Sequence, residues 1–322
     1  MATDVFYVTS FRQLRLSETL PGDFTLLPGV QITNDPAVKK RLLTPDYARY
    51  AGVIEFDHLQ TAPNLVFGEL RESDMCGAPP GPFLRAVLLW IEGLFDNAWL
   101  LKDHAMRCEA VHLAHRTQRG TVWTSNFLAT NPSFADGTVE QVVEMSLSDL
   151  KLWARTNDRV ESYLYEEKSS RTNFMLEKGY TRSGRAMRFV KAARGAPDMA
   201  FKISHYCSAL ETLFTTGTTE LSHRLSERAA FFLDTKGNNK LRVFTTVKRA
   251  YDVRSKLVHG ETLTPRQVDD LPQLSTEIDG YLRTILNAIF ETDDLRRVFD
   301  SHSNAVEEYF TRLILGDKES DS

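Results

Sequence analysis

Apolar residues follow two different periods along this chain, and the change of period divides it into two parts. Before about residue 80 they form short β-branched or aromatic runs, which proline, glycine and asparagine separate. This arrangement is typical of strands joined by turns. The runs predicted as strands are residues 5–8, 24–27 and 53–56.

A helix is predicted after these strands. The segment 77–82 is rich in glycine and proline, so it ends any regular element, and Pro82 suits the first turn of a helix. Residues 83–101 repeat apolar side chains at steps of three and four, which predicts that helix. Further strands are expected within 111–128 and 139–145. These elements together predict an α+β domain over residues 1–150.

From about residue 147 onward the pattern is helical. We interpret residues 151–182 as a helical connector, because much of this stretch is charged and polar. An all-α domain is predicted over 183–315, followed by a disordered tail over 316–322. The first expected helix of this domain has Ser183 as its cap, runs through Val190 and is ended by Gly195-Ala196-Pro197. The following expected helices are 198–214, 221–233, 240–259, 268–290 and 304–315.

Composition narrows the class of protein without indicating a function. The 322 residues carry a net charge of −4, which excludes a globally basic nucleic-acid binder and leaves a local basic patch open. The cysteines form no Cys-x-x-Cys pair and no apolar leader follows the start, so we expect a cytoplasmic protein. The most apolar stretch, 83–101, contains Arg85, Glu92 and Asp96, so we expect no membrane span.

One charged residue is unexpected on the helix predicted over 240–259. The apolar positions of this helix are Val243, Val247, Ala250, Tyr251, Leu257 and Val258. Their period of 3.6 residues places Arg254 in the middle of the apolar stripe. A guanidinium keeps its charge in a protein, so Arg254 needs an anionic partner, an interface or a ligand. An ion pair with Glu211, at the margin of the apolar face of the helix 198–214, is one explanation.

A histidine follows at the end of the same helix. Gly260 is the usual residue for closing a helix in the left-handed conformation, which places His259 in the last turn. The negative end of the helix dipole favours the imidazolium form there. Taken alone, a histidine at this position more often stabilises the helix end, and a role in a site is the alternative.

The surroundings of these two residues resemble a known family. Four residues separate Arg254 from His259, within the sequences Tyr251-x-x-Arg254-Ser255 and Val258-His259-Gly260. An arginine followed after four to six residues by a histidine near a helix C-terminus is the hallmark of the HEPN superfamily. Together with the segments 209–214 and 220–229, the motif resembles the Apea-like branch of HEPN domains. The resemblance covers about residues 183–292 and does not reach the first 150 residues.

The resemblance implies an endoribonuclease that uses neither a metal nor a cofactor. The ribose 2′-hydroxyl attacks the adjacent phosphate and leaves a 2′,3′-cyclic phosphate and a 5′-hydroxyl end. His259 would accept or donate the proton, since imidazole exchanges protons near neutral pH. Arg254 would stabilise the charge on the pentacovalent phosphorus with its bidentate fork.

Helix geometry adds a condition on how this pair acts. Residues five apart on an ideal helix differ by about 140° in direction and by about 7.5 Å along the axis. A single helix therefore presents Arg254 and His259 poorly to one phosphate. The resemblance implies a homodimer through the HEPN domain, in which two such helices meet at a two-fold axis.

Other residues are candidates for support or for RNA contact. Ser255 is a candidate hydrogen-bond partner of the phosphate or the histidine, Glu211 is the orienting partner of Arg254, and Tyr251 lies one turn before it. Arg228 is a structural or a phosphate contact. Lys256 and a row of cations at three-residue spacing are candidates for binding the RNA backbone, and a solvated helix face is the alternative explanation of the row. The row consists of Arg182, Arg185, Arg188, Lys191 and Arg194.

These inferences lead to one hypothesis and two alternatives. The hypothesis is a dimeric HEPN ribonuclease, a toxin or anti-phage defence effector whose N-terminal domain senses or targets, with an antitoxin or a phage-derived trigger as a further partner. The first alternative is a non-catalytic HEPN scaffold or an RNA- or nucleotide-binding module. The second is an enzyme whose site lies in the N-terminal domain, where we find no supporting motif.

Overall fold

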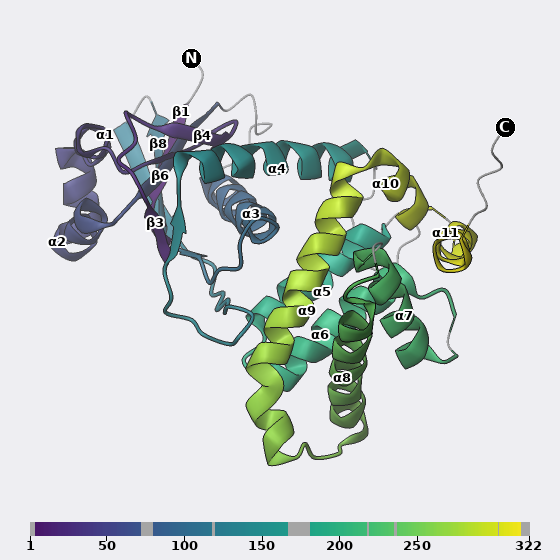
Figure 1. The fold of residues 1–322 in the computed structure, drawn as a ribbon. Helices are drawn as coiled ribbons and strands as arrows, with labels where there is room; N and C mark the ends of the chain where they lie inside the picture. The colour runs from purple at the N-terminus through teal and green to yellow at the C-terminus, as the bar shows by residue number, and fades with distance from the viewer. Residues whose placement is uncertain are drawn as a thin grey trace. The chain divides into compact units, whose positions relative to one another are not determined.

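The computed structural model describes residues 4–71, 80–117, 120–166, 181–217, 219–234, 237–301 and 303–316 (Figure 1). The described strands all lie in the N-terminal part, together with several helices, and the C-terminal part is helical, which confirms the predicted order of a mixed part followed by a helical part. Residues 1–132 and 139–159 form one compact unit, called unit 1, and residues 133–138 and 160–322 form unit 2. None of the described helices is long and apolar enough to cross a lipid bilayer.

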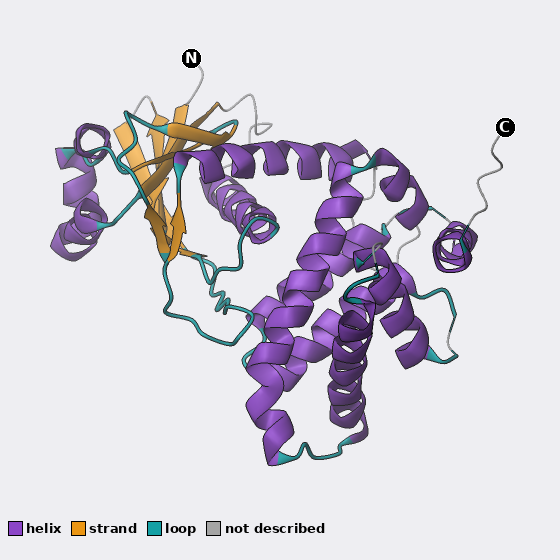
Figure 2. Ribbon diagram, viewed as in Figure 1, coloured by secondary structure: helices purple, strands orange, loops and turns teal. Residues whose placement is uncertain are grey.

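Unit 1 is built on an antiparallel β-sheet (Figure 2). The strands of the unit are β1 (Asp4–Thr9), β2 (Phe11–Arg12), β3 (Leu14–Leu16), β4 (Phe24–Leu27), β5 (Val30–Thr33), β6 (Leu65–Arg71), β7 (Arg107–Cys108), β8 (Val111–Thr117), β9 (Gly120–Asn126) and β10 (Val143–Met145). The sheet has the order β4-β5-β6-β1-β8-β9, and β2 pairs with β7 and β3 with β10. The predicted strands 5–8 and 24–27 are present, whereas the segment 139–145 contributes only the three residues of β10.

Helices cover both faces of this sheet. α1 (Pro36–Leu42) and α2 (Pro45–Thr61) pack on the face that carries Val8, and Tyr47 of α2 meets His112 of β8 there. α3 (Pro80–Trp99) and the first part of α4 (Leu147–Glu166) pack on the other face, where Phe83 and Trp153 join the core. Residues 151–159, which we interpreted as part of a connector, therefore belong to unit 1.

The strand predicted at residues 53–56 is wrong, because these residues lie in α2. The side chain of Thr44 caps this helix by accepting a hydrogen bond from the backbone N–H of Tyr47. Val53 and Ile54 are 77% and 82% exposed, so neither β-branched side chain is part of a core. A short apolar run does not by itself distinguish a strand from a helix. The helix is interrupted at Gly52, whose φ of 78° is accessible to glycine without steric cost.

Unit 2 is helical. Its helices are α5 (Arg182–Gly195), α6 (Met199–Phe214), α7 (Leu221–Leu233), α8 (Lys240–His259), α9 (Pro265–Glu291), α10 (Asp293–Phe299) and α11 (Ser303–Leu315). α6 contacts α5, α7, α8 and α9, and its predicted apolar stripe, including Ile203 and Leu210, is fully buried. The bounds of α7 and α8 match the predicted bounds residue for residue. α10 is a helix that the sequence pattern did not predict.

The predicted cap of α5 is wrong. Thr181 caps this helix, because its hydroxyl accepts a hydrogen bond from the backbone N–H of Gly184 at 3.0 Å. Ser183 lies in the first turn instead, and its backbone N–H and hydroxyl donate to the Asp300 carboxylate at 3.1 and 2.9 Å. Asp300 follows α10, so this contact connects two distant segments of unit 2.

Some predicted segments lie outside the described residues. These are residues 72–79, which include the start of the glycine- and proline-rich segment, residues 167–180 of the predicted connector, and residues 317–322 of the predicted tail.

Candidate functional site

The buried face of α8 differs slightly from the predicted one. Its buried residues are Val243, Thr246, Val247, Ala250 and Val253. The buried stripe therefore passes through Val253, and Arg254 lies at its margin rather than in its middle. Val258, which the period assigned to the stripe, is 62% exposed. Near the end of α8 a shift of one residue in the stripe moves a side chain by about 100° around the helix and changes its burial.

Arg254 has two partners in unit 2. Its Nη2 donates to Oε2 of Glu211 on α6 at 3.3 Å, and its Nη1 donates to the Tyr251 hydroxyl at 3.2 Å. The guanidinium carbon also lies 5.2 Å from the centroid of the Tyr251 ring, within the range of a cation–π contact. The ion pair with Glu211, one of the explanations that the sequence left open, is therefore present. We call these three residues the Arg254 cluster.

The Glu211 carboxylate is the electrostatic centre of the Arg254 cluster. Burial raises the pKa of Glu211 above its ordinary value, and the charge of Arg254 and the hydroxyl of Tyr251 reduce this rise. The pKa of Tyr251 is raised by burial and by the charge of Glu211. Arg254 thus favours the charged carboxylate, and the carboxylate holds the guanidinium in a fixed position.

His259 forms the exposed end of α8. Gly260 follows with a φ of 74°, and the N–H of Glu261 donates to the carbonyl of Lys256 at 2.9 Å. The helix therefore ends in the left-handed turn that the sequence predicted. Among the described residues, no hydrogen bond or ion pair joins His259 to the Arg254 cluster. Ser255 is half-buried on the turn between them.

Lys256 is not a free cation on the surface of α8. Its Nζ forms an ion pair with Asp252 at 3.0 Å and donates to Oε1 of Gln267 at 3.2 Å. Its charge is therefore matched within unit 2, and the contact with an RNA backbone stays a prediction.

Arg228 lies in a different group of side chains from Arg254. It is buried, and it donates to the carbonyl of Phe214 and to the carboxylate of Glu307, both at 2.6 Å. Its guanidinium carbon lies 5.0 Å from the centroid of the Phe310 ring. Of the two predicted roles the structure supports the structural one, because these contacts join α7 to the end of α6 and to α11.

The row of cations on α5 does not form one continuous exposed face. Arg182 donates to the carbonyls of Thr212 and Thr215, both at 3.0 Å, and Arg194 is buried. Arg185 and Lys191 are half-buried, and Arg188 is exposed. Arg182 and Arg194 are therefore turned into unit 2, whereas an RNA contact of Arg185, Arg188 and Lys191 stays a prediction.

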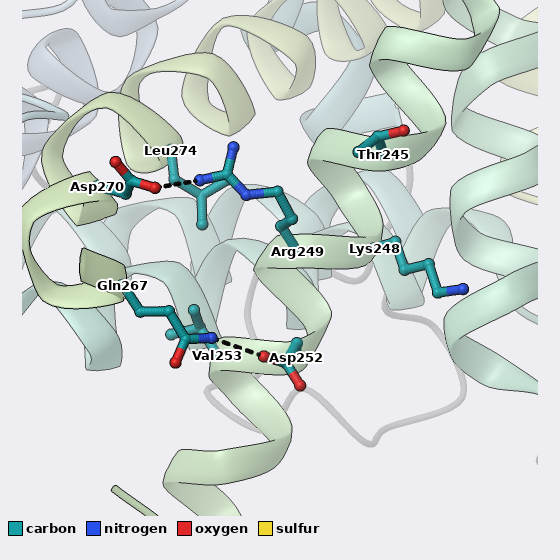
Figure 3. Close-up of a pocket in the computed structure, with 8 residues that line it drawn as sticks. All are labelled: Thr245, Lys248, Arg249, Asp252, Val253, Gln267, Asp270 and Leu274. Carbon is teal, nitrogen blue, oxygen red and sulfur yellow. Dashed lines mark hydrogen bonds and ion pairs between the residues drawn. The ribbon is translucent and has the colours of Figure 1, made fainter. Parts of the chain in front are cut away.

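Sequence reasoning missed a cavity of about 320 Å³ between α8 and α9 (Figure 3). Its polar lining consists of Thr245, Lys248, Arg249 and Asp252 from α8, and of Gln267 and Asp270 from α9. Charged residues at such spacings are ordinary on a solvated helix face, so they give no signal before the two helices are packed. Among the described residues, no three histidine, cysteine, aspartate or glutamate side chains lie together in a way that could hold a metal ion.

Comparisons of the chain with family models, with curated proteins and with solved structures found no match.

Proposed function

We propose that this chain is a metal-independent endoribonuclease of the HEPN type, which acts as a homodimer. The observation that carries the proposal is that one helix holds both a positioned arginine and an accessible histidine: Arg254 is held by Glu211 and Tyr251, and His259 is exposed where α8 ends. The motif that these residues form is the one on which the resemblance to HEPN domains rests.

The chemistry follows from the two side chains. His259 takes the proton of the ribose 2′-hydroxyl, or returns a proton to the departing 5′-oxygen, as the 2′-oxygen forms a bond to phosphorus. Arg254 donates hydrogen bonds to the phosphate oxygens, on which negative charge accumulates in the transition state. The products are a 2′,3′-cyclic phosphate and a 5′-hydroxyl end.

A dimer can bring an arginine and a histidine to one phosphate, although Arg254 and His259 leave α8 in different directions. Arg254 is turned towards α6, where Glu211 binds it, and His259 lies five residues further along α8, which rotates it by about 140°. A second copy with its α8 antiparallel across a two-fold axis would place its own arginine near the histidine of the first. The defence role, as a toxin or anti-phage effector with unit 1 as the sensing part, belongs to the same proposal and comes from the resemblance alone.

One observation favours a second candidate function, a non-catalytic scaffold or an RNA- or nucleotide-binding module. The charge of Arg254 is already compensated by Glu211, as it would be in a residue that only stabilises the helix bundle. In this alternative His259 only stabilises the end of α8.

The test is expression of the wild-type chain beside His259→Ala, with growth and total RNA integrity as readouts. Damage to RNA and arrested growth in the wild type only would support the ribonuclease. The matched control is His223→Ala, which removes another exposed histidine of unit 2 and should behave as the wild type. Equal and harmless expression of all three, with soluble protein in each case, would favour the scaffold.

A further inference from the structure

Two polar bridges connect α8 and α9 across the cavity shown in Figure 3. Nη2 of Arg249 donates to Oδ2 of Asp270 at 2.9 Å, and Nε2 of Gln267 donates to Oδ2 of Asp252 at 3.1 Å. Val253 and Leu274, both buried, form the apolar part of the lining. A cavity of about 320 Å³ lies at the lower end of the range for small-molecule sites, which is enough for one planar base.

The two bridges differ in how easily a ligand can open them. Gln267 also accepts hydrogen bonds from the backbone N–H of Thr264 and from Lys256, and it takes part in the capping box of α9, so its position is fixed. The side chains of Arg249 and Asp270 are 50% and 43% exposed. An ion pair this exposed contributes little free energy in water. A ligand that offers both groups equivalent hydrogen bonds can therefore replace it at little cost.

The donors and acceptors of this exposed pair match one nucleobase better than the others. On its Watson–Crick edge, guanine presents the acceptor O6 beside two adjacent donors, N1–H and N2–H. Adenine, cytosine and uracil each present only one donor group on the same edge. A guanidinium donates to O6, and a carboxylate can accept from both donors at once. We propose that the cavity between α8 and α9 binds a guanine base of the RNA substrate, with Arg249 donating to O6 and Asp270 accepting from N1–H and N2–H.

The cavity lies on the face of α8 that leads to His259. Asp252 and His259 are seven residues apart, so on an ideal helix they differ by about 20° in direction and by about 10.5 Å along the axis. A single strand that places a base in the cavity can thus run along this face towards the exposed histidine. This inference rests on the proposed ribonuclease function and names the base that determines where the RNA is held.

The direct test is the binding of GMP, AMP, CMP and UMP to the full-length chain by calorimetry. GMP should bind at least about tenfold more tightly than the other three, and Asp270→Asn should remove most of this preference. Arg249→Gln should weaken GMP binding as well. The matched control is Asp294→Asn on α10, which removes an exposed carboxylate that also pairs with an arginine, and it should leave binding unchanged. The side chains of Asp270 and Asp294 are both accessible to solvent, so neither Asp270→Asn nor Asp294→Asn should lower the melting temperature.

Equal binding of the four nucleotides, no binding of GMP, or GMP binding that Asp270→Asn leaves intact would overturn the proposal. Mapping of cleavage sites on a mixed-sequence RNA separates this result from the proposed function. Cleavage without guanine preference, in the same pattern for wild type and Asp270→Asn, refutes the base site and leaves the ribonuclease standing. GMP binding that depends on Asp270 in a chain that cuts no RNA supports the base site and refutes the ribonuclease.

Discussion

Nη2 of Arg254 lies 3.3 Å from Oε2 of Glu211, so the arginine of α8 has an anionic partner within its own subunit. The two side chains are 27% and 18% exposed, which leaves the guanidinium accessible from one side and the carboxylate mostly desolvated. The same contact can position Arg254 for a phosphate or only satisfy its charge. Activity and stability measured on the same variants separate these roles.

Arg254→Lys should lower the rate of RNA cleavage by about 10²-fold or more, comparable with the loss of one donor to a developing oxyanion. Lysine keeps the charge that Glu211 needs but lacks the bidentate fork. The melting temperature should change little, and both quantities are measured on the same purified protein. Unchanged cleavage by Arg254→Lys would show that Arg254 does not act on the phosphate.

Arg254→Met should cost on the order of 1–3 kcal/mol of unfolding free energy, because the Glu211 carboxylate then loses its charged partner in a partly buried site. Adding Glu211→Gln should restore most of the stability, since the uncompensated charge is gone. Cleavage should remain lost in the double variant. Urea unfolding of the wild type, the two single variants and the double variant gives the coupling energy. A double variant that regains both stability and cleavage would contradict the catalytic role.

His259→Ala should lower cleavage by about 10²- to 10⁴-fold, the usual contribution of a general acid or base. Because His259 is exposed and its side chain has no hydrogen bond or ion pair among the described residues, the cost in stability should be less than about 1 kcal/mol. Mixing His259→Ala with Arg254→Met should test the dimer as well. In a site shared across a two-fold axis, the mixed dimer retains one site with both Arg254 and His259 intact, so activity should recover in part. No recovery would argue for sites within single subunits.

Chelation should leave RNA cleavage unchanged, since the proposed mechanism uses the 2′-hydroxyl of the substrate itself. Treatment with EDTA followed by analysis of the product ends should give 2′,3′-cyclic phosphates, and DNA of the same sequence should remain intact. Loss of cleavage with EDTA, or cutting of DNA, would refute this mechanism.

Arg228→Met should lower the unfolding free energy by about 2–3 kcal/mol, because a buried guanidinium that donates to the Phe214 carbonyl and to Glu307 is removed. The contrast is Arg297→Met on α10, whose ion pair with Asp294 is exposed and should contribute less than about 1 kcal/mol. Thermal and urea unfolding measure both. Specific activity of the folded fraction of Arg228→Met should equal that of the wild type if the residue has only a structural role.

Stability should depend on pH through Asp300. Burial raises the pKa of Asp300 from 3.8 to about 6, against the opposing effect of backbone hydrogen bonds from Ser183 and Arg182. The folded chain therefore holds this proton more tightly than the unfolded chain does. The contribution to stability is fully present below about pH 3.8 and is lost as the pH rises through about 6.

Asp300→Asn removes this titration while keeping an acceptor for Ser183. Relative to the wild type, the variant should gain on the order of 2–3 kcal/mol of unfolding free energy when the pH is raised from about 4 to 7. Urea unfolding across that range measures the difference, with Asp294→Asn as the control for loss of a carboxylate. Parallel pH profiles for Asp300→Asn and the wild type would contradict the raised pKa.

The sequence by itself determined most helices of unit 2, with α10 as the exception, because their signals are local. Apolar positions at a period of 3.6 residues predict α6, α7 and α8, and the side chain of Asp198 caps α6 through the N–H groups of Ala200 and Phe201. Gly260 ends α8 because glycine accepts a positive φ without steric cost. Each of these interactions involves residues within a few positions of one another, so a linear pattern is sufficient to predict it.

Tertiary structure decided the features that depend on distant segments. Residues 53–56 are helical although their side chains favour strands, and Arg228 is buried although arginine is usually exposed. The ammonium group of Lys256 forms an ion pair with Asp252 on its own helix and a hydrogen bond with Gln267 on α9. The cavity that Arg249 and Asp270 line exists only where α8 and α9 face each other. Burial and charge compensation are properties of the packed elements together, and the local pattern records which face of a helix is apolar but not which neighbour covers it.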